Sequence, residues 1–406
     1  MSTPTEPFRM GRTEFVALLA MMLASVAFSI DSMLPALPEI GLELTPDAVE
    51  KAPLILTMFL LGMGLGTFVT GPLSDAFGRK RVILASSVLF IASAAVAYVS
   101  QSFEMVLAAR LVQGLGASGP RVVTNAIVRD RFSGRQMAKI MSIIMMIFVL
   151  VPAVAPLLGS FIIVWSGWRG IFLAFIVFSA TFTLWMTFRL PETLPLESRR
   201  PMRLGLLWRA AKEVLGHPIV RLSIVVQMLV SATLFLTLML VQPIYDLVYD
   251  RGSEFPYWFF AVAIVAGSAS LLNALLVVRF GMWKLITWAI GAQIILAGTF
   301  VAFDLGDGAY GFYFFLFWQT SIFFQAGLSF GNLNAIAMEP MGHIAGMAAS
   351  VISAFSTVGA VAISGPIGTR FNGSEHILIL SVLILSLISM ACMFRMALHM
   401  RKSGTA

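Results

Sequence analysis

Hydrophobic residues along this chain fall into long runs separated by short polar segments. Each run is close to the roughly 20 residues that a helix needs to cross the hydrocarbon layer of a membrane. Strands of an outer-membrane barrel would be only about 10 residues long and would alternate in polarity, which these runs do not. The pattern predicts an all-α polytopic membrane protein with twelve transmembrane helices, at 13–37, 52–74, 80–100, 103–127, 137–161, 167–189, 218–245, 255–279, 282–304, 309–337, 344–370 and 374–398.

The longest polar segment, 191–217, follows the sixth predicted helix and divides the chain into two six-helix halves, 1–190 and 218–406. This basic segment fits a cytoplasmic helix lying along anionic headgroups or a flexible tether, and both interpretations remain open. A weak repeat supports a duplicated unit: a glycine turn, Phe77-Gly78-Arg79-Lys80, follows the second helix, and Phe280-Gly281-Met282-Trp283-Lys284 follows the eighth. Repeated six-helix units are typical of transporters.

Composition and charge agree with a membrane protein. Of 406 residues, 59% are hydrophobic and 12% charged, about half the charged share of soluble domains. The net charge of +7 comes from the loops between the predicted helices. The loops on one side of the membrane hold many arginines and lysines, among them Arg79, Lys80, Arg81, Arg129 and Arg131. The loops on the other side hold only Lys51, Arg169, Arg251 and Arg370. The positive-inside rule then predicts a multi-pass membrane protein with both termini in the cytoplasm. The first run is too long for a signal-peptide core, so it is expected to be an uncleaved helix.

Two opposite charges are predicted to lie at one depth inside the membrane. Asp31 is near the outer end of the first helix, and Arg110 is a similar distance from the outer start of the fourth. A charge at the bilayer centre costs roughly 3 kcal/mol or more, so each needs a partner or a task. Arginine keeps its proton, whereas a carboxylate that is both paired and desolvated can exchange one. We expect Asp31 and Arg110 to couple protons to transport; a static ion pair between helices is the alternative.

The strongest local motif lies between the second and third predicted helices: Gly71-Pro72-Leu73-Ser74-Asp75-Ala76-Phe77-Gly78-Arg79-Lys80-Arg81. An ordinary basic loop would explain its arginines but neither Asp75 nor the glycine spacing. Together with the 6+6 layout, it resembles the signature of the major facilitator superfamily. That resemblance implies the major facilitator fold and a cytoplasmic gate built on Gly71, Asp75, Gly78 and Arg79.

Further motifs narrow the resemblance to the twelve-helix drug:proton antiporters, and within them to the Bcr/CflA drug-resistance subfamily. The antiporter resemblance rests on Asp31-Ser32-Met33-Leu34-Pro35-Ala36-Leu37-Pro38 and on Leu107, Arg110, Gln113, Gly114, Gly116 and Ala117. The subfamily resemblance rests on Val128-Arg129-Asp130, Ala155-Pro156-Leu157-Leu158-Gly159, Gly167-Trp168-Arg169 and Leu190-Pro191-Glu192-Thr193-Leu194. The helix-five motif keeps Pro156 and Gly159 but has Val151, Ala155 and Ser160 where that motif normally carries glycine, so it supports export only in part.

Arg121 departs from the family pattern. It lies eleven residues after Arg110, so the two side chains are about 20° apart on one face of a helix. It is either a cavity cation that favours acidic or zwitterionic substrates or a snorkelling or ion-paired arginine. Amides inside the membrane need hydrogen-bonding surroundings, which makes several of them cavity candidates with Arg121: Gln113, Asn125, Gln242, Asn273, Gln319 and Gln325. Tyr245 is a further candidate, as one of the aromatic residues that could form an adaptable apolar cavity.

The sequence indicates neither an enzyme nor a metalloprotein. Its single cysteine, Cys392, has no disulfide partner, and its four histidines lack a second ligand at metal-site spacing. Nothing resembles a nucleotide-binding loop or a nucleophile triad. We therefore expect no cofactor, no metal, no catalytic residue and no nucleic-acid partner.

The resemblance to the Bcr/CflA group implies a secondary active transporter of the bacterial inner membrane, a monomer in the lipid bilayer, that exports small amphipathic compounds or drugs in exchange for protons. A dedicated exporter or proton-symport importer of a metabolite or siderophore-like anion is the alternative within transporters. A non-transporting membrane receptor is the alternative from another class. The sequence does not name the substrate.

Overall fold

The computed structural model describes residues 10–199 and 204–402. Twelve long helices carry the fold: α1 (Arg12–Asp31), α3 (Leu54–Phe77), α4 (Arg79–Val99), α5 (Phe103–Arg131), α6 (Gly134–Ser166), α7 (Arg169–Arg189), α9 (Pro218–Leu247), α10 (Phe255–Phe280), α11 (Met282–Ala302), α12 (Gly311–Met338), α13 (Ala345–Gly368) and α14 (His376–Lys402). Shorter helices connect them: η1 (Leu34–Ala36), α2 (Leu37–Leu44), η2 (Val49–Lys51), η3 (Leu196–Ser198), α8 (Leu204–Gly216), η4 (Gly252–Glu254) and η5 (Glu339–Ile344). The helical prediction is confirmed.

Ten stretches of the described chain are long and apolar enough to cross a membrane. Two features reconcile this number with twelve long helices. The last-but-one stretch, Gly311–Gly368, runs through both α12 and α13, and α5 is not among the ten stretches. The protein is therefore a multi-pass membrane protein with a twelve-helix bundle, as the hydrophobic pattern predicted.

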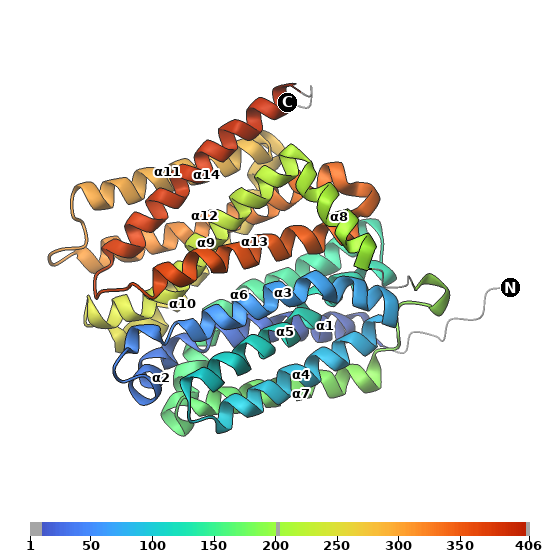
Figure 1. Cartoon of the computed structure of the whole chain (residues 1–406), viewed down its shortest axis with the longest axis horizontal. Coiled ribbons are helices and arrows are strands. Elements are labelled where there is room, and N and C mark those ends of the chain that lie inside the picture. The colour runs from blue at the N-terminus through green and yellow to red at the C-terminus, as the bar shows by residue number, and fades with distance from the viewer. Residues whose placement is uncertain (1–9, 200–203, 403–406) are drawn as a thin grey trace.

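The twelve helices form two groups of six that follow chain order. In Figure 1 the first group, blue to green, lies below the second, yellow to red. Within the first group α5 packs on α3 and α4, and α1 packs on α6; within the second, α9 packs on α13 and α14, and α12 on α10 and α11. The groups meet chiefly where α3 contacts α13 and α6 contacts α10.

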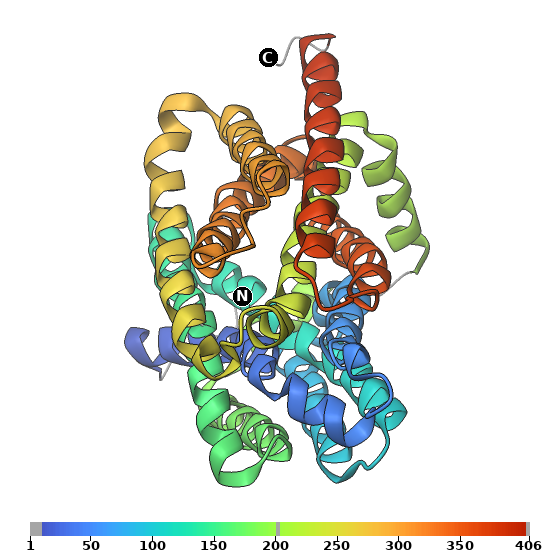
Figure 2. The same ribbon diagram turned by 90° about the vertical axis from the view of Figure 1, so that its left-hand side faces the viewer.

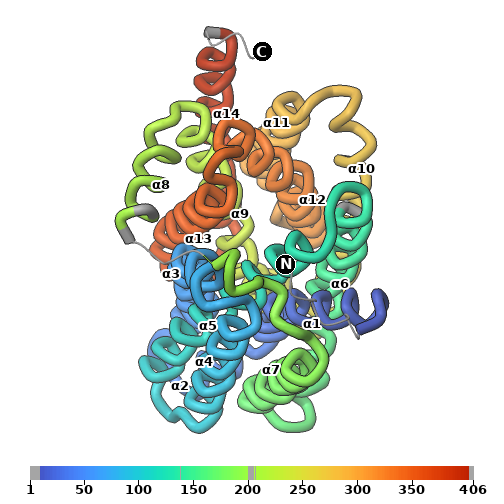
Figure 3. The backbone as a smooth tube through the Cα atoms, turned by 90° about the vertical axis from the view of Figure 1, so that its right-hand side faces the viewer, coloured from blue at the N-terminus to red at the C-terminus, as the bar shows by residue number. Residues whose placement is uncertain are grey.

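The two ends of the bundle differ in how the halves are packed. We call the end with η1, η2 and η4 the acidic end (Figure 2) and the end with the α3–α4 turn the basic end (Figure 3). At the acidic end one apolar cluster joins both halves, with Met33 and Leu37 from the first and Met239 and Ile244 from the second. At the basic end the main clusters stay within single halves. The halves are thus closed together at the acidic end.

Helix α8 occupies much of the polar segment between the halves. Leu207, Ala210, Ala211 and Val214 are buried on one side of it, and the helix contacts α13 and α9 (Figure 3). Its apolar side therefore faces protein, although the exposed Trp208 beside Lys212 remains available to a membrane surface. Residues 200–203 of the segment lie outside the described residues.

Glycines let α3 and α5 approach closely. A side chain at Gly62 would meet the backbone of Leu111, and one at Gly114 would meet the backbone of Phe59. Backbone atoms cannot rotate away as a flexible side chain can, so these contacts fix the spacing of the two helices.

We expect Gly62→Val to destabilise the first half, because the added side chain would force α3 and α5 apart. Overpacking of this kind costs roughly 1–3 kcal/mol. Thermal unfolding of the purified protein in detergent should show a lower melting temperature for Gly62→Val. The matched control is Gly298→Val in α11, where a side chain meets nothing within 4 Å; equal melting of the two variants would contradict the packing argument.

Candidate functional site

Asp31 is the last residue of α1, and its side chain is buried, with 5% of its surface exposed. The predicted helix 13–37 stops there because the chain turns at Ser32 and Met33 and continues as η1, which contains Pro35. Within the described residues the Asp31 carboxyl group has no hydrogen bond and no ion pair. Burial without a partner is costly for a charged group, so this acid lies where a change of protonation has a large energetic effect.

The helix-five motif, which the structure places on α6, lies against this break in α1. Pro152 and Pro156 are inside α6, and a side chain at Gly159 would meet the backbone carbonyl of Ser32. Only glycine permits this approach, so Gly159 brings α6 onto the residue that follows Asp31. The structure brings together two motifs that lie far apart in the sequence.

Arg110 is fully buried in α5 and holds the end of α1. Its guanidinium donates to the backbone carbonyl of Ser29 (3.0 Å), to Oε1 of Gln113 (2.7 Å) and, at 3.4 Å, to the carbonyl of Ile55. It also lies 4.3 Å from the ring centroid of Phe59. The last carbonyls of a helix lack intrahelical donors and carry partial negative charge, so a cation is stabilised there.

Asp31 and Arg110 form no direct ion pair within the described residues, so the alternative of a static ion pair finds no support in this conformation. Arg110 instead contacts the carbonyl two residues before Asp31, because the helix ends at that point and leaves its carbonyls free. Gln113, which the sequence offers as a cavity candidate, accepts a hydrogen bond from Arg110 in this conformation. Gln113 is fully buried and orients the guanidinium.

Arg121 and Asn125 lie one turn apart on α5, toward the basic end. Arg121 is partly exposed and Asn125 exposed, while Val123, Thr124 and Ala126 are buried. Within the described chain Arg121 has no hydrogen bond or ion pair. The ion-paired interpretation of Arg121 therefore finds no partner in this conformation.

The candidates of the second half lie in separate places. The Tyr245 hydroxyl donates to Oε1 of Gln319 (2.8 Å), and both residues are buried. Asn332 donates to Oδ1 of Asn273 (2.7 Å), linking α12 to α10, so these amides stabilise contacts within the half. Gln325 is buried, and its Oε1 has no hydrogen-bond partner among the described residues.

Gln242 lies at the acidic end instead, in the walls of two cavities between the halves. One cavity has a volume of about 410 Å³ and the other about 360 Å³. Asp31, Arg110 and Arg121 do not line either of them. Gln242 is thus separated from the other cavity candidates.

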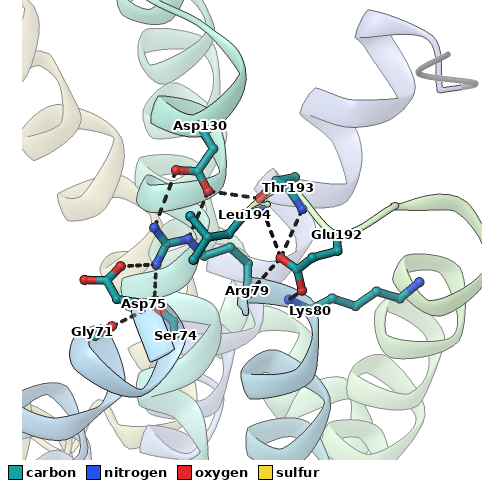
Figure 4. A network of polar contacts seen from close by, with 9 residues as sticks. All are labelled: Gly71, Ser74, Asp75, Arg79, Lys80, Asp130, Glu192, Thr193 and Leu194. Carbon is teal, nitrogen blue, oxygen red and sulfur yellow. Dashed lines mark hydrogen bonds and ion pairs between the residues drawn. The ribbon is translucent and has the colours of Figure 1, made fainter. Parts of the chain in front are cut away.

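The predicted gate motif forms a polar network at the basic end (Figure 4). Arg79 is its centre: the buried guanidinium donates to Asp75, to the Ser74 hydroxyl (2.7 Å) and to Asp130 (2.9 Å). Thr193 also donates to Asp130 (3.0 Å). The network links α3, α4, α5 and the segment after α7, all in the first half.

Glu192 fixes the start of α4 in the same network. Its carboxylate accepts hydrogen bonds from the backbone N–H groups of Arg79 (2.9 Å) and Lys80 (3.2 Å), which have no intrahelical partner. The preceding Gly78 has a φ of 98°, and Gly281 in the repeated turn has 81°. Both turns need the left-handed conformation that glycine adopts easily, which confirms the repeat as a shared backbone geometry.

Asp130 and Glu192 belong to segments that the sequence singled out only for their resemblance to the drug-resistance subfamily. Their pairing with Arg79 was not predicted. The sequence did hold a signal for these contacts, because each of the two segments that resemble the subfamily carries an acid near the basic end of the predicted bundle. Sequence spacing alone does not show that these segments meet.

The described residues contain no group of three His, Cys, Asp or Glu side chains that could hold a metal ion. The fold is built instead from membrane helices with buried charges and a basic-end network. Residues 17–366 match the sequence profile of the Major Facilitator Superfamily. The chain belongs to this superfamily, and it is a transport protein, not an enzyme.

Relatives within the superfamily agree with the motifs. The chain is 30% identical over 376 residues to the bicyclomycin resistance protein homolog of Haemophilus influenzae, covering 86% of this chain and 88% of that protein. It is 28% identical to the multidrug resistance protein MdtL of Shigella flexneri, over 80% of each chain. A match of 37% identity to the uncharacterized MFS-type transporter YdgK of Bacillus subtilis spans only 48% of each chain. These similarities confirm the resemblance to the Bcr/CflA group of drug:proton antiporters.

Solved structures agree with the fold. The structure of the xylose transporter XylE from E. coli superimposes with a TM-score of 0.71 over 94% of this chain and 97% of that chain. The sequence identity is 14%, so this similarity concerns the fold alone.

Proposed function

We propose that this superfamily member exports small amphipathic drugs from the bacterial cytoplasm in exchange for protons. The observation that carries the proposal is Asp31: a buried carboxyl group without a partner in the described chain, at the end of a helix whose carbonyls bind Arg110. A proton there changes the charge beside a helix break without touching the fixed charge of Arg110. The similarity to bicyclomycin and multidrug resistance proteins supports drugs as the substrate class.

The proposed orientation places the basic end and both termini in the cytoplasm, following the positive-inside rule. In that orientation the acidic end, where the halves are packed together, faces outward, and the conformation is inward-facing. We propose a monomer in the inner-membrane bilayer, since each chain already contains both halves of the transport unit.

The cycle follows from these positions. The inward-facing protein binds substrate while Asp31 is ionised. A proton arriving from outside neutralises Asp31, weakens its attraction to the Arg110 region and favours release of the substrate outward. The halves then reclose at the acidic end, and the proton leaves toward the cytoplasm.

Transport in proteoliposomes tests this function. Purified protein should accumulate bicyclomycin, a zwitterionic fluoroquinolone or tetraphenylphosphonium against a gradient when a pH difference of the correct sign is imposed. Collapse of the pH difference with a protonophore should abolish accumulation. If none of the three compounds accumulates although the protein is folded and correctly inserted, the proposal is contradicted.

We also propose that Asp75 holds the basic end in its closed state. In this inward-facing conformation Gly71, one turn before Asp75, already approaches Ser350 of α13. We propose that closure of the basic end brings Asp75 onto the start of that helix, which belongs to the other half. The positive end of that helix is a second partner for the carboxylate besides Arg79.

Asp75→Asn should shift the protein toward the inward-facing state. Charge-assisted contacts contribute roughly 1–3 kcal/mol, which corresponds to about a tenfold change in a two-state equilibrium. Distances between spin labels on the basic-end termini of α3 and α13 should show more of the open population. Glu197→Gln, which removes an exposed charge at the same end, is the control. An unchanged distance distribution in Asp75→Asn would count against the latch.

A second candidate function is the transport of one acidic metabolite. Arg121 favours it, since a partly exposed arginine without a partner in the described residues offers two parallel donors to a carboxylate or phosphate. Both functions use the same coupling residues and differ in substrate selectivity.

Arg121→Gln should weaken binding of acidic and zwitterionic compounds about tenfold, the effect of losing one charge-assisted contact. Lipophilic cations should bind equally well or better. Arg129→Gln, an exposed arginine on the same helix, should change neither. If all ligands weaken equally and the melting temperature falls by several degrees, Arg121 has a structural role.

A further inference from the structure

The cavity of about 360 Å³ at the acidic end has features of a second ligand site, separate from the proton-coupling residues. Both halves form its walls: Leu37, Glu50 and Pro53 from the first, and Gln242, Asp246 and Phe371 from the second. Its volume is within the range of small-molecule pockets. A molecule bound there would touch both halves at the end where they are packed together.

The polar side chains that line this cavity are two carboxylates and one amide, and none of them is positively charged. Glu50 and Asp246 supply carboxylates, and neither has a hydrogen bond or ion pair with another described residue. Gln242 is 4% exposed, and its buried Oε1 also has no partner among the described residues. The accessible polar groups of the cavity are therefore the carboxylates of Glu50 and Asp246, which are both exposed, and they favour a ligand that supplies positive charge.

The remaining wall is apolar and includes an exposed rim. Leu42 and Leu247, one from each half, are 67% and 66% exposed. Among the described residues, no lysine, arginine or histidine lines the cavity. Two carboxylates beside apolar side chains are complementary to a cationic amphiphile and unfavourable to an anion.

We propose that this cavity, between α2, η2 and the turn before α3 of one half and α9 and the segment after α13 of the other, is a second binding site for small cationic amphiphiles. The charge requirement is opposite to that of Arg121, so this site and an Arg121 site would select different ligands. Helix α2 follows Asp31 after only the short η1, and a ligand that holds α2 against α9 would stabilise the closed acidic end. The site is therefore regulatory: its occupant favours this conformation over one that is open at the acidic end.

Photolabelling of the full-length protein locates the site without requiring transport. The probe is benzyltrimethylammonium with a diazirine on its ring, and the matched neutral probe is the neopentylbenzene analogue, in which carbon replaces the charged nitrogen. Mass spectrometry should find the cationic label in the peptides that contain Leu42, Leu247 and Phe371. The neutral probe should label them less, because it gains nothing from the two carboxylates.

The double variant Glu50→Gln, Asp246→Asn should reduce cationic labelling of these peptides about threefold or more, the effect expected from two partly solvated charge contacts. Glu39→Gln, which removes an exposed acid from α2 outside the cavity, should leave labelling unchanged. Equal labelling by the neutral probe, or by the double variant, would overturn the proposal and indicate an apolar groove filled by any hydrophobic molecule. Labelling only near Asp31 and Arg121 would overturn it too, by assigning the cation to the transport site.

Discussion

Asp31→Asn is expected to abolish uphill transport while leaving the protein folded. The amide resembles the protonated acid in size and charge, so the variant is fixed in one protonation state and cannot carry a proton through the cycle. Folding should be preserved because the Asp31 carboxyl group has no partner to lose among the described residues. Accumulation driven by an imposed pH difference should fall to background, whereas exchange of labelled for unlabelled substrate should continue.

Asp47→Asn is the matched control, since it removes an exposed acid from the loop after α2. That variant should accumulate substrate as the unmodified protein does. An Asp31→Asn protein that still concentrates substrate against a gradient would assign the proton to another residue.

Arg79→Ala is expected to have the largest effect on stability. Arg79 is 5% exposed and is the common partner of Asp75 and Asp130. Its removal leaves the carboxylates of Asp75 and Asp130 without their shared cation. Breaking a buried network costs roughly 3–5 kcal/mol, and the lower end applies here because the Asp75 side chain is 43% exposed. Thermal unfolding of the purified protein should therefore begin at a lower temperature.

Two further variants separate the network from a general loss of charge. Arg81→Ala removes an exposed arginine two residues away and should leave the melting temperature unchanged. Arg79→Lys keeps the charge but cannot reach Asp75, Ser74 and Asp130 together, so it should fall between the other two. If Arg79→Ala and Arg81→Ala melt alike, the network does not stabilise the first half.

The fold followed from the sequence because its determinants are local and periodic. Each membrane crossing requires an uninterrupted apolar run, and most predicted boundaries lie within a few residues of the observed helices. The end of α1 at Asp31 was missed because the run continues through Leu34 and Leu37. Hydrophobicity does not distinguish one helix from two helices with a break between them.

The site followed from the sequence only in part. Buried charges are rare enough in a membrane helix to identify Asp31 and Arg110 as residues of interest. Their contacts depend on how helices far apart in the sequence meet, which no spacing rule gives: Arg110 binds a backbone carbonyl, and backbone atoms carry no sequence signal. Sequence spacing also could not predict the interaction of Glu192 with the start of α4 or the position of Gln242 at the acidic end, because both depend on how distant segments pack.

Proton movement during substrate exchange tests the central claim most directly. Proteoliposomes that contain the protein and an internal pH-sensitive dye would receive bicyclomycin or another transported compound outside, with no pH difference imposed. We predict that substrate moving into the vesicles drives protons out, so the interior becomes alkaline, and that Asp31→Asn gives no pH change. Substrate uptake without any pH change, or with acidification of the interior, would contradict proton exchange through Asp31.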